Sequence, residues 1–173
     1  MKMKNLLGAA LFAILILSSG YNVSAQNLKF AHVNSDELIQ VMPEFDSASK
    51  QLESFRNDLL NALELMTVDF NNKNDQYQRE IKTYTDVVRQ TKEQELIDMN
   101  RRIQEFQNNA QNQLQERQTA LFQPVYTKLD QAIKDVGKDN GFIYVFDVKG
   151  LLYFDAAKST DITALTKTKL GIK

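Results

Sequence analysis

The sequence predicts an α+β protein, in which a small β-rich body built from both ends of the chain carries a long antiparallel helical hairpin of coiled-coil type. Residues 44–123 form a run of 80 residues without proline or glycine, the two residues that most often interrupt helices. Segments rich in β-branched and aromatic residues lie on either side of this run, at 28–34 and 142–154.

A leader segment precedes the predicted body. Two lysines come before an apolar run at 6–17, and small residues follow at 23–25, an order typical of a secretory signal peptide. The apolar run is shorter than the roughly 20 residues that cross a bilayer as a helix. We therefore expect residues 1–25 to be cleaved, with an uncleaved membrane anchor as the alternative. Export without cysteine fits the bacterial periplasm.

The composition argues against several kinds of site. The chain has no cysteine and a single histidine, His32, so neither a thiolate nor a multi-histidine metal site is expected. Its net charge of -1 provides no general attraction to nucleic acid. Carboxylates such as Asp147 and Asp155 have no base or nucleophile at a recognisable spacing. We expect a protein that is not an enzyme, needs no cofactor or metal, and uses His32 structurally.

The long run without proline or glycine is predicted to be two helices. Apolar residues recur three and four positions apart in both halves of it, which places one apolar stripe on each helix. Stripe residues are scarce at 83–93, so we place the reversal near residues 87–93, with one straight helix as the alternative. The second helix is expected to continue to a stop signal at Asp139-Asn140-Gly141.

The seam between these helices has an unusual composition. Asn and Gln make up 21 of the 80 residues, and Phe, Tyr and Met recur where a tight coiled coil prefers Leu, Ile and Val. One interpretation is an ordinary coiled coil with an aromatic core. The other is an arm that is only partly zipped, whose inner face contacts a client protein. On the second interpretation, the client-facing residues are Phe55, Met66, Phe70, Tyr77, Tyr84, Met99 and Phe106.

The N-terminal part of the body is predicted to be a strand followed by a short helix. Residues 28–34 have the alternation of a strand. Asn34 is placed to cap the next helix, and Glu37 three residues later completes the pattern of a capping box. The short helix at 36–41 is expected to stop before Pro43.

The C-terminal part is predicted to be a β-hairpin and a final helix. Residues 142–146 are nearly all apolar, as in a central strand covered on both faces. A turn at 148–150 would lead into a second strand at 151–154. Residues 159–161 are expected to cap a terminal helix at 162–170.

The predicted body has more apolar surface than its size explains. Residues 26–43 and 124–173 form this body, and residues 44–123 form the arm. The strands and short helices of the body hold about 60 residues, a size at which an isolated core is marginal. We therefore expect copies of the chain to pack together as a homo-oligomer. The interface residues are predicted to be Phe30, Phe142, Tyr144, Phe146, Leu152 and Phe154.

The order of these elements resembles the Skp/OmpH family of periplasmic chaperones. The stretches that carry the resemblance are Lys29-Phe-Ala-His-Val-Asn34, Asn140-Gly-Phe-Ile-Tyr-Val-Phe-Asp147, Leu152-Tyr-Phe154 and Ser159-Thr-Asp-Ile-Thr163. The resemblance implies a jellyfish-like homotrimer, in which three helical hairpins project as tentacles around a cavity. It also implies that unfolded outer-membrane proteins are held there without ATP, metal or covalent chemistry.

The charge of the arm differs from that of the strongly basic family members. Residues 73–102 carry seven basic against six acidic side chains, so the end of the arm is nearly neutral. We expect apolar contacts and hydrogen bonds to contribute more to binding here, and membrane contact to be peripheral at most. The function predicted is an ATP-independent holdase. The alternative is an envelope coiled-coil scaffold or adaptor that docks one folded partner.

Overall fold

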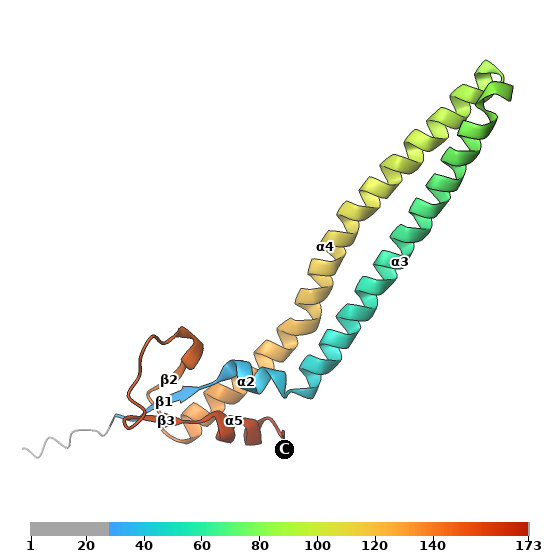
Figure 1. Ribbon diagram of the computed structural model, residues 1–173. Helices are drawn as coiled ribbons and strands as arrows, with labels where there is room; N and C mark the ends of the chain where they lie inside the picture. Colours follow the sequence, from blue (N-terminus) through green and yellow to red (C-terminus); the bar gives the residue numbers. More distant parts are fainter. Residues whose placement is uncertain (1–27, 173) are drawn as a thin grey trace, which may run out of the picture.

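The computed structural model of the protein describes residues 28–172, so the signal peptide expected at residues 1–25 lies outside the described part of the chain. The described residues are mostly helical and include one three-stranded sheet. The sheet and two short helices lie together at one end, and two long helices extend from them side by side (Figure 1). No helix within residues 28–172 has both the length and the apolar character needed to cross a bilayer.

The sheet is parallel, and the N-terminal strand is at its centre. Strand β1 (Phe30–Val33) pairs on one side with β2 (Tyr144–Asp147) and on the other with β3 (Ser159–Asp161). Parallel neighbours need a crossover connection rather than a tight turn. The two long helices together supply that connection between β1 and β2.

The β-hairpin predicted at 142–154 is wrong. Residues 151–154 form no strand, and β2 is an edge strand with exposed side chains rather than a covered central one. The chain leaves β2 through the short 3-10 helix η2 (Val148–Gly150), where the Asp147 carboxylate accepts a hydrogen bond from the Lys149 backbone N–H at 3.1 Å. It then crosses to the far side of β1. The residues expected to cap the last helix form β3 there.

Helix α2 (Ser35–Gln40) begins as the sequence predicts. The Asn34 side chain accepts a hydrogen bond from the Glu37 backbone N–H at 3.1 Å. The second half of the predicted capping box is wrong, because the Asn34 backbone N–H donates to the Thr163 hydroxyl oxygen instead of to Glu37. Leu38 and Met42 are fully buried, and Pro43 then occupies the first turn of the next helix, where its missing N–H costs nothing.

The two long helices are α3 (Pro43–Glu80) and α4 (Asp86–Asp139), joined through the 3-10 helix η1 (Ile81–Thr83). The reversal therefore lies at 81–85, and its predicted position near residues 87–93 is wrong. The physical reason is local. The Thr85 hydroxyl oxygen accepts a hydrogen bond from the Val88 backbone N–H, and Asp86 stands in the first turn, so a new helix starts there.

Helix α4 runs through Pro124 without ending, although proline cannot donate a hydrogen bond to the carbonyl of Ala120. It ends at the predicted stop signal, where Gly141 adopts a positive φ of 70°. Near that end Gly137 is buried against β2, and a Cβ at this position would meet Val145 Cγ2 at 3.0 Å. The final helix, α5 (Thr163–Lys169), packs against α4 and α2.

The buried core lies where β1, α2, α5 and the base of α4 meet. Its most completely buried residues include Ala31, Val33 and Ile162, and Leu129 and Val136 contribute from α4. The core thus depends on both ends of the chain, while the far parts of α3 and α4 pack mainly on each other.

Candidate binding surfaces of the arm and the body

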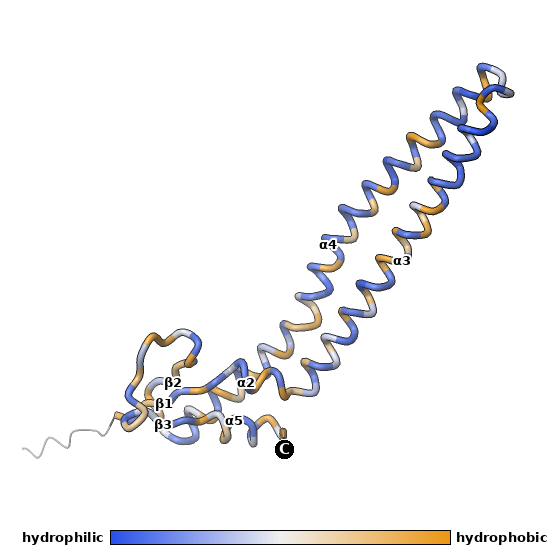
Figure 2. The backbone as a smooth tube through the Cα atoms, viewed as in Figure 1, coloured by the Kyte–Doolittle hydropathy of each residue, from blue (hydrophilic) through white to orange (hydrophobic). Residues whose placement is uncertain are grey.

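We call α3, η1 and residues 86–123 of α4 the arm. Its two helices are mostly hydrophilic, with hydrophobic positions at intervals (Figure 2). The structure places the seven predicted client-facing residues at partly or fully buried positions of α3, α4 and the turn between them. Tyr77 and Met99 are buried, and the other five are half-buried. In a single chain these side chains are therefore mostly covered by the arm itself.

The distal end of the arm is held by hydrogen bonds and ion pairs between the helices. The Tyr77 hydroxyl donates to Glu93 Oε1 at 2.5 Å, and Lys73 is ion-paired with Glu95. The Tyr84 ring lies 6.1 Å from that of Tyr77. The hydrogen bond from Lys73, followed by that from Lys92, holds the pKa of Glu95 below its ordinary value. The hydrogen bond to Glu93 and the loss of solvent raise the pKa of Tyr77.

The base of the arm is held by a second set of contacts. Lys128 is ion-paired with Glu44 at the start of α3. Its hydrogen bond lowers the pKa of the Glu44 carboxyl. Nearby, the rings of Phe45 and Phe122 meet edge to face with their centroids 5.2 Å apart. The two helices are thus fixed in register at both ends.

The middle of the arm has hollows rather than polar contacts. Among the described residues, no side-chain hydrogen bond or ion pair joins α3 to α4 between the Lys73–Glu95 pair and the Glu44–Lys128 pair. A groove of about 430 Å³ lies there between the helices. A smaller hollow of about 120 Å³ lies beside Met66 and Met99. The groove is lined by Arg56, Leu59, Leu60, Leu63, Phe106, Gln107, Asn108, Ala110, Gln111 and Leu114.

The arm also exposes large apolar side chains that the sequence analysis did not select. Leu65 on α3 is 71% exposed and Ile97 on α4 is 61% exposed. The full exposed set on the arm is Leu60, Leu65, Val68, Val87, Val88 and Ile97. Five of them are apolar residues outside the regular three-and-four stripe, which is a signal in the sequence, whereas Val88 lies on the stripe itself. Only the position of the facing helix shows that they point away from the seam.

The six predicted interface residues lie in the body, mostly at its surface. Phe30 stacks on Tyr144 with ring centroids 6.2 Å apart, although Tyr144 remains 58% exposed. Phe142 is half-buried against the core, and Phe146 is exposed on β2. Leu152 is fully exposed in the loop after η2, which is hydrophobic over part of its length (Figure 2). The edge strand β2 and the apolar loop after η2 are therefore exposed to solvent in the single chain.

His32 lies inside the sheet, as a structural residue would. It is only 8% exposed, and its Nδ1 lies 2.8 Å from the Ser159 hydroxyl oxygen. The Phe154 ring covers it, with centroids 4.3 Å apart. Phe154, the last of the six predicted interface residues, therefore packs against the central strand β1.

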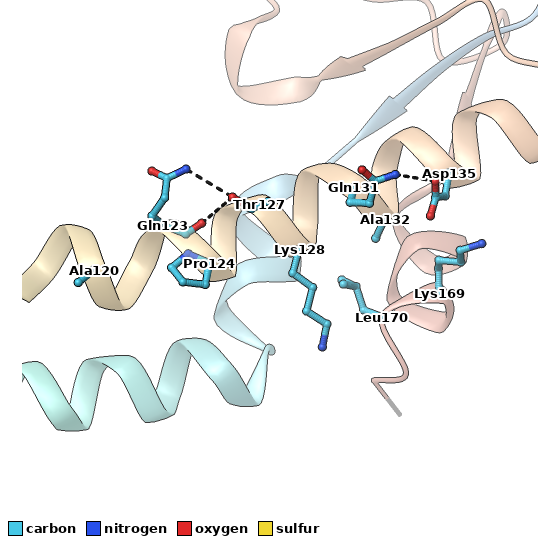
Figure 3. A pocket seen from close by; sticks show the side chains of 10 residues that line it. All are labelled: Ala120, Gln123, Pro124, Thr127, Lys128, Gln131, Ala132, Asp135, Lys169 and Leu170. Atoms are coloured by element: carbon cyan, nitrogen blue, oxygen red, sulfur yellow. Dashed lines mark hydrogen bonds between the residues drawn. The ribbon is translucent and has the colours of Figure 1, made fainter.

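A further hollow, of about 710 Å³, lies at the base of α4 beside the end of α5 (Figure 3). The polar side chains on its wall bond mainly within α4. The Gln123 amide donates to the Thr127 hydroxyl, and Gln131 donates to Asp135. Its two lysines, Lys128 and Lys169, are ion-paired with Glu44 and Asp139. The wall is mostly apolar, both of its lysines are ion-paired, and its one carboxylate, Asp135, accepts the hydrogen bond from Gln131.

Comparisons with known proteins agree on one group. A family model described as "Outer membrane protein (OmpH-like)" matches residues 29–170. The chain is 28% identical over 172 residues to "Chaperone protein Skp" of Photorhabdus luminescens, covering 96% of this chain and 100% of the relative. It is 29% identical over 167 residues to the protein of the same name from Yersinia enterocolitica, covering 94% and 96%.

A solved structure shows the same fold. The structure of an OmpH-like protein from Caulobacter crescentus CB15 matches with a TM-score of 0.72 over 83% of both chains, at 13% sequence identity. The matched 83% of the chain is more than the arm or the body alone contains, so the structural similarity includes parts of both.

Proposed function

The chain belongs to the OmpH-like family of outer membrane proteins, and we propose that it is a chaperone that holds unfolded outer-membrane proteins in the periplasm without using ATP. The curated relatives named as Skp chaperones support this role. The proposal includes a homotrimer whose arms, as helical-hairpin tentacles, surround a shared cavity for the client.

The observation that carries the proposal is the exposed apolar surface of the arm. Leu65, Val68 and Ile97 stand on helices whose remaining surface is dense in charged and carboxamide side chains. Unfolded barrel proteins present strands in which apolar residues alternate with polar ones. Each apolar contact contributes about 25 cal/mol per Å² of buried surface. Many weak contacts of this kind sum to tight binding, and they release without fuel when the client folds.

The open edge of the body supports the proposed trimer. Tyr144 and Phe146 on β2, with Leu152 in the following loop, give a second copy an apolar surface and a strand edge to pair with. Assembly would bring several arms to one client. The effective concentration of the remaining arms then keeps the client bound when one arm releases it.

The seven seam residues are proposed as a second set of client contacts. Because they are covered in the single arm, they become available only where the helices leave space or separate. Changing Phe70, Tyr77 and Tyr84 together to alanine is expected to weaken client binding while the oligomer persists. Unchanged affinity in an intact oligomer would remove these three residues from the client surface.

The holdase activity is tested by dilution of an unfolded client. A barrel protein unfolded in urea is diluted into buffer with and without the protein, and aggregation is followed by light scattering. Suppression at near-stoichiometric amounts of oligomer is expected for several different barrel proteins. Unchanged scattering for all of them, with the oligomer confirmed intact, would instead favour a scaffold with one dedicated folded partner.

A matched pair of variants locates the contact surface. Changing Leu65, Val68 and Ile97 to serine removes exposed apolar surface without opening the seam. We expect weaker suppression of scattering with little change in thermal stability. Changing the exposed polar residues Thr67, Gln104 and Gln118 to alanine serves as the control and is expected to leave suppression intact. Equal suppression by both variants would exclude the exposed apolar residues as contacts.

A further inference from the structure

The groove in the middle of the arm has a local cause. The register set by the Lys73–Glu95 and Glu44–Lys128 pairs brings Ala110 to the level of Leu59 and Leu63. The alanine is too small to fill the space between two helices there. The apolar register of α3 also slips between Leu59 and Leu63, so that neighbouring Leu60 turns partly toward solvent. Contacts at both ends of the arm keep the helices from sliding to close this space.

The lining of the groove has the chemistry of a peptide-binding site. Its floor is formed by leucines together with Phe106. Its rim carries Gln107, Asn108 and Gln111, whose side chains make no hydrogen bond to any other described residue. Carboxamides both donate and accept, so they match the alternating N–H and C=O groups of an extended backbone.

The charge of the residues that line the groove indicates which kind of peptide segment it can bind. Arg56 is the one charged residue among those lining the groove, and within residues 28–172 it has no ion-pair partner. No carboxylate lines the groove. A guanidinium beside an apolar floor complements a carboxylate that lies close to an apolar side chain. The volume of about 430 Å³ is near the lower end of the usual range of ligand pockets, which suits side chains rather than a folded element.

We infer that this groove receives an aromatic or branched apolar side chain of an extended client segment, with an acidic residue of the same segment beside Arg56. The inference rests on the proposed chaperone function and assigns it one contact point within a single arm. Phe106, one of the residues predicted as client-facing, lies in the floor of this site.

A variant in which a larger side chain fills the groove tests client binding without lowering the stability of the arm. In the full protein, Ala110→Leu adds apolar volume where space exists, so the thermal midpoint is expected to rise or hold. The probe is a fluorescent peptide that alternates phenylalanine and threonine and carries one glutamate. We expect its dissociation constant to increase about tenfold, since one large apolar side chain is no longer buried. Ala110→Met is the second variant, because methionine adapts to irregular space and favours helix.

Two controls decide the outcome. Ala120→Leu adds the same volume to the exposed side of α4 outside the groove and is expected to leave peptide affinity unchanged. Arg56→Gln is expected to weaken binding of the peptide that carries glutamate, but not binding of the same peptide with glutamine instead of glutamate. Unchanged affinity in both Ala110 variants, or equal losses in Ala120→Leu, would overturn the inference. A lost oligomer in both Ala110 variants would also overturn it, since the groove would then be an interface between copies.

The proposed function can fail separately from this inference. If the unmodified protein does not suppress aggregation of any barrel client, the chaperone proposal fails and the groove loses its client. If suppression is normal and filling the groove changes neither suppression nor peptide binding, only the groove is excluded.

Discussion

The backbone N–H of Asn34 donates a hydrogen bond to the hydroxyl oxygen of Thr163 at 3.0 Å, although 129 positions separate the two residues in the chain. Asn34 follows the first strand and caps α2, and Thr163 begins the last helix. One step away, the backbone N–H of Ile162 donates to the carbonyl of His32 at 2.9 Å. These hydrogen bonds thus join the N-terminal and C-terminal parts of the body from which the arm extends.

Removing the Thr163 hydroxyl is expected to destabilise the body. Thr163→Val keeps the shape of the side chain but leaves the Asn34 N–H without its partner in a largely buried place. We expect the free energy of unfolding to fall by about 1–2 kcal/mol, measured by urea unfolding at fixed protein concentration. Thr168→Val, at an exposed position of the same helix, is the control and is expected to have a smaller effect. Equal effects of the two changes would show that the Asn34 contact contributes nothing.

Gly137 is expected to be required for the fit of α4 against β2. In Gly137→Ala the new Cβ meets Val145 Cγ2 at 3.0 Å, and a β-branched side chain has little freedom to move away. The cost of overpacking should exceed the gain in helix propensity, giving a net loss of about 1 kcal/mol. In a Val145→Ala background the same change should be neutral or stabilising. Simple additivity in this double-mutant cycle would contradict the packing argument.

The ion pairs of the arm are expected to make its stability sensitive to acid. The pKa of Glu95 is lowered in the folded protein, chiefly by its hydrogen bond with Lys73. Its contribution is therefore complete above the unfolded pKa of about 4.3 and is lost as the pH falls through the lower folded pKa. The thermal midpoint should fall less between pH 6 and pH 3 in Glu95→Gln than in the unmodified protein. Glu116→Gln, an exposed carboxyl on the same helix, is the matched control and should retain the full decrease.

The exposed loop after η2 is expected to be needed for assembly. Leu152 and Tyr153 are largely exposed in the single chain, so changing both to serine removes little contact from the monomer fold. We expect the mass in solution to fall to that of one chain, measured by sedimentation across a range of concentrations. The control is Leu165→Ser on α5, which also removes an exposed leucine. A monomeric unmodified protein at every concentration would contradict the predicted oligomer.

Local signals in the sequence predicted the helices and several of their ends correctly. The Asn34 cap and the stop at Gly141 depend on residues within a few positions of each other, and both are confirmed. The turn of the arm lies before its predicted position, because Thr85 and Asp86 together form a local start signal for a helix. The scarcity of stripe residues at 83–93 is therefore a weaker signal for the position of the turn than this cap.

Contacts between distant parts of the chain were harder to predict. The apolar run at 142–146 indicates a strand, but not that it pairs in parallel with residues 30–33 at the sheet edge. The central strand covered on both faces that this run also predicts is wrong, since Tyr144 and Phe146 are exposed in the single chain, where both are predicted interface residues. The groove beside Ala110 also needs the register of two helices, which depends on pairs such as Lys73 with Glu95.

The central claim is that the arm binds outer-membrane proteins only while they are unfolded. The most direct measurement is the affinity for one labelled barrel protein, presented once by dilution from urea and once folded in detergent micelles, with no ATP present. We predict binding of the unfolded form and no measurable binding of the folded form. Equal affinity for both forms, or binding of the folded form alone, would contradict the proposed holdase and indicate an adaptor for a folded partner.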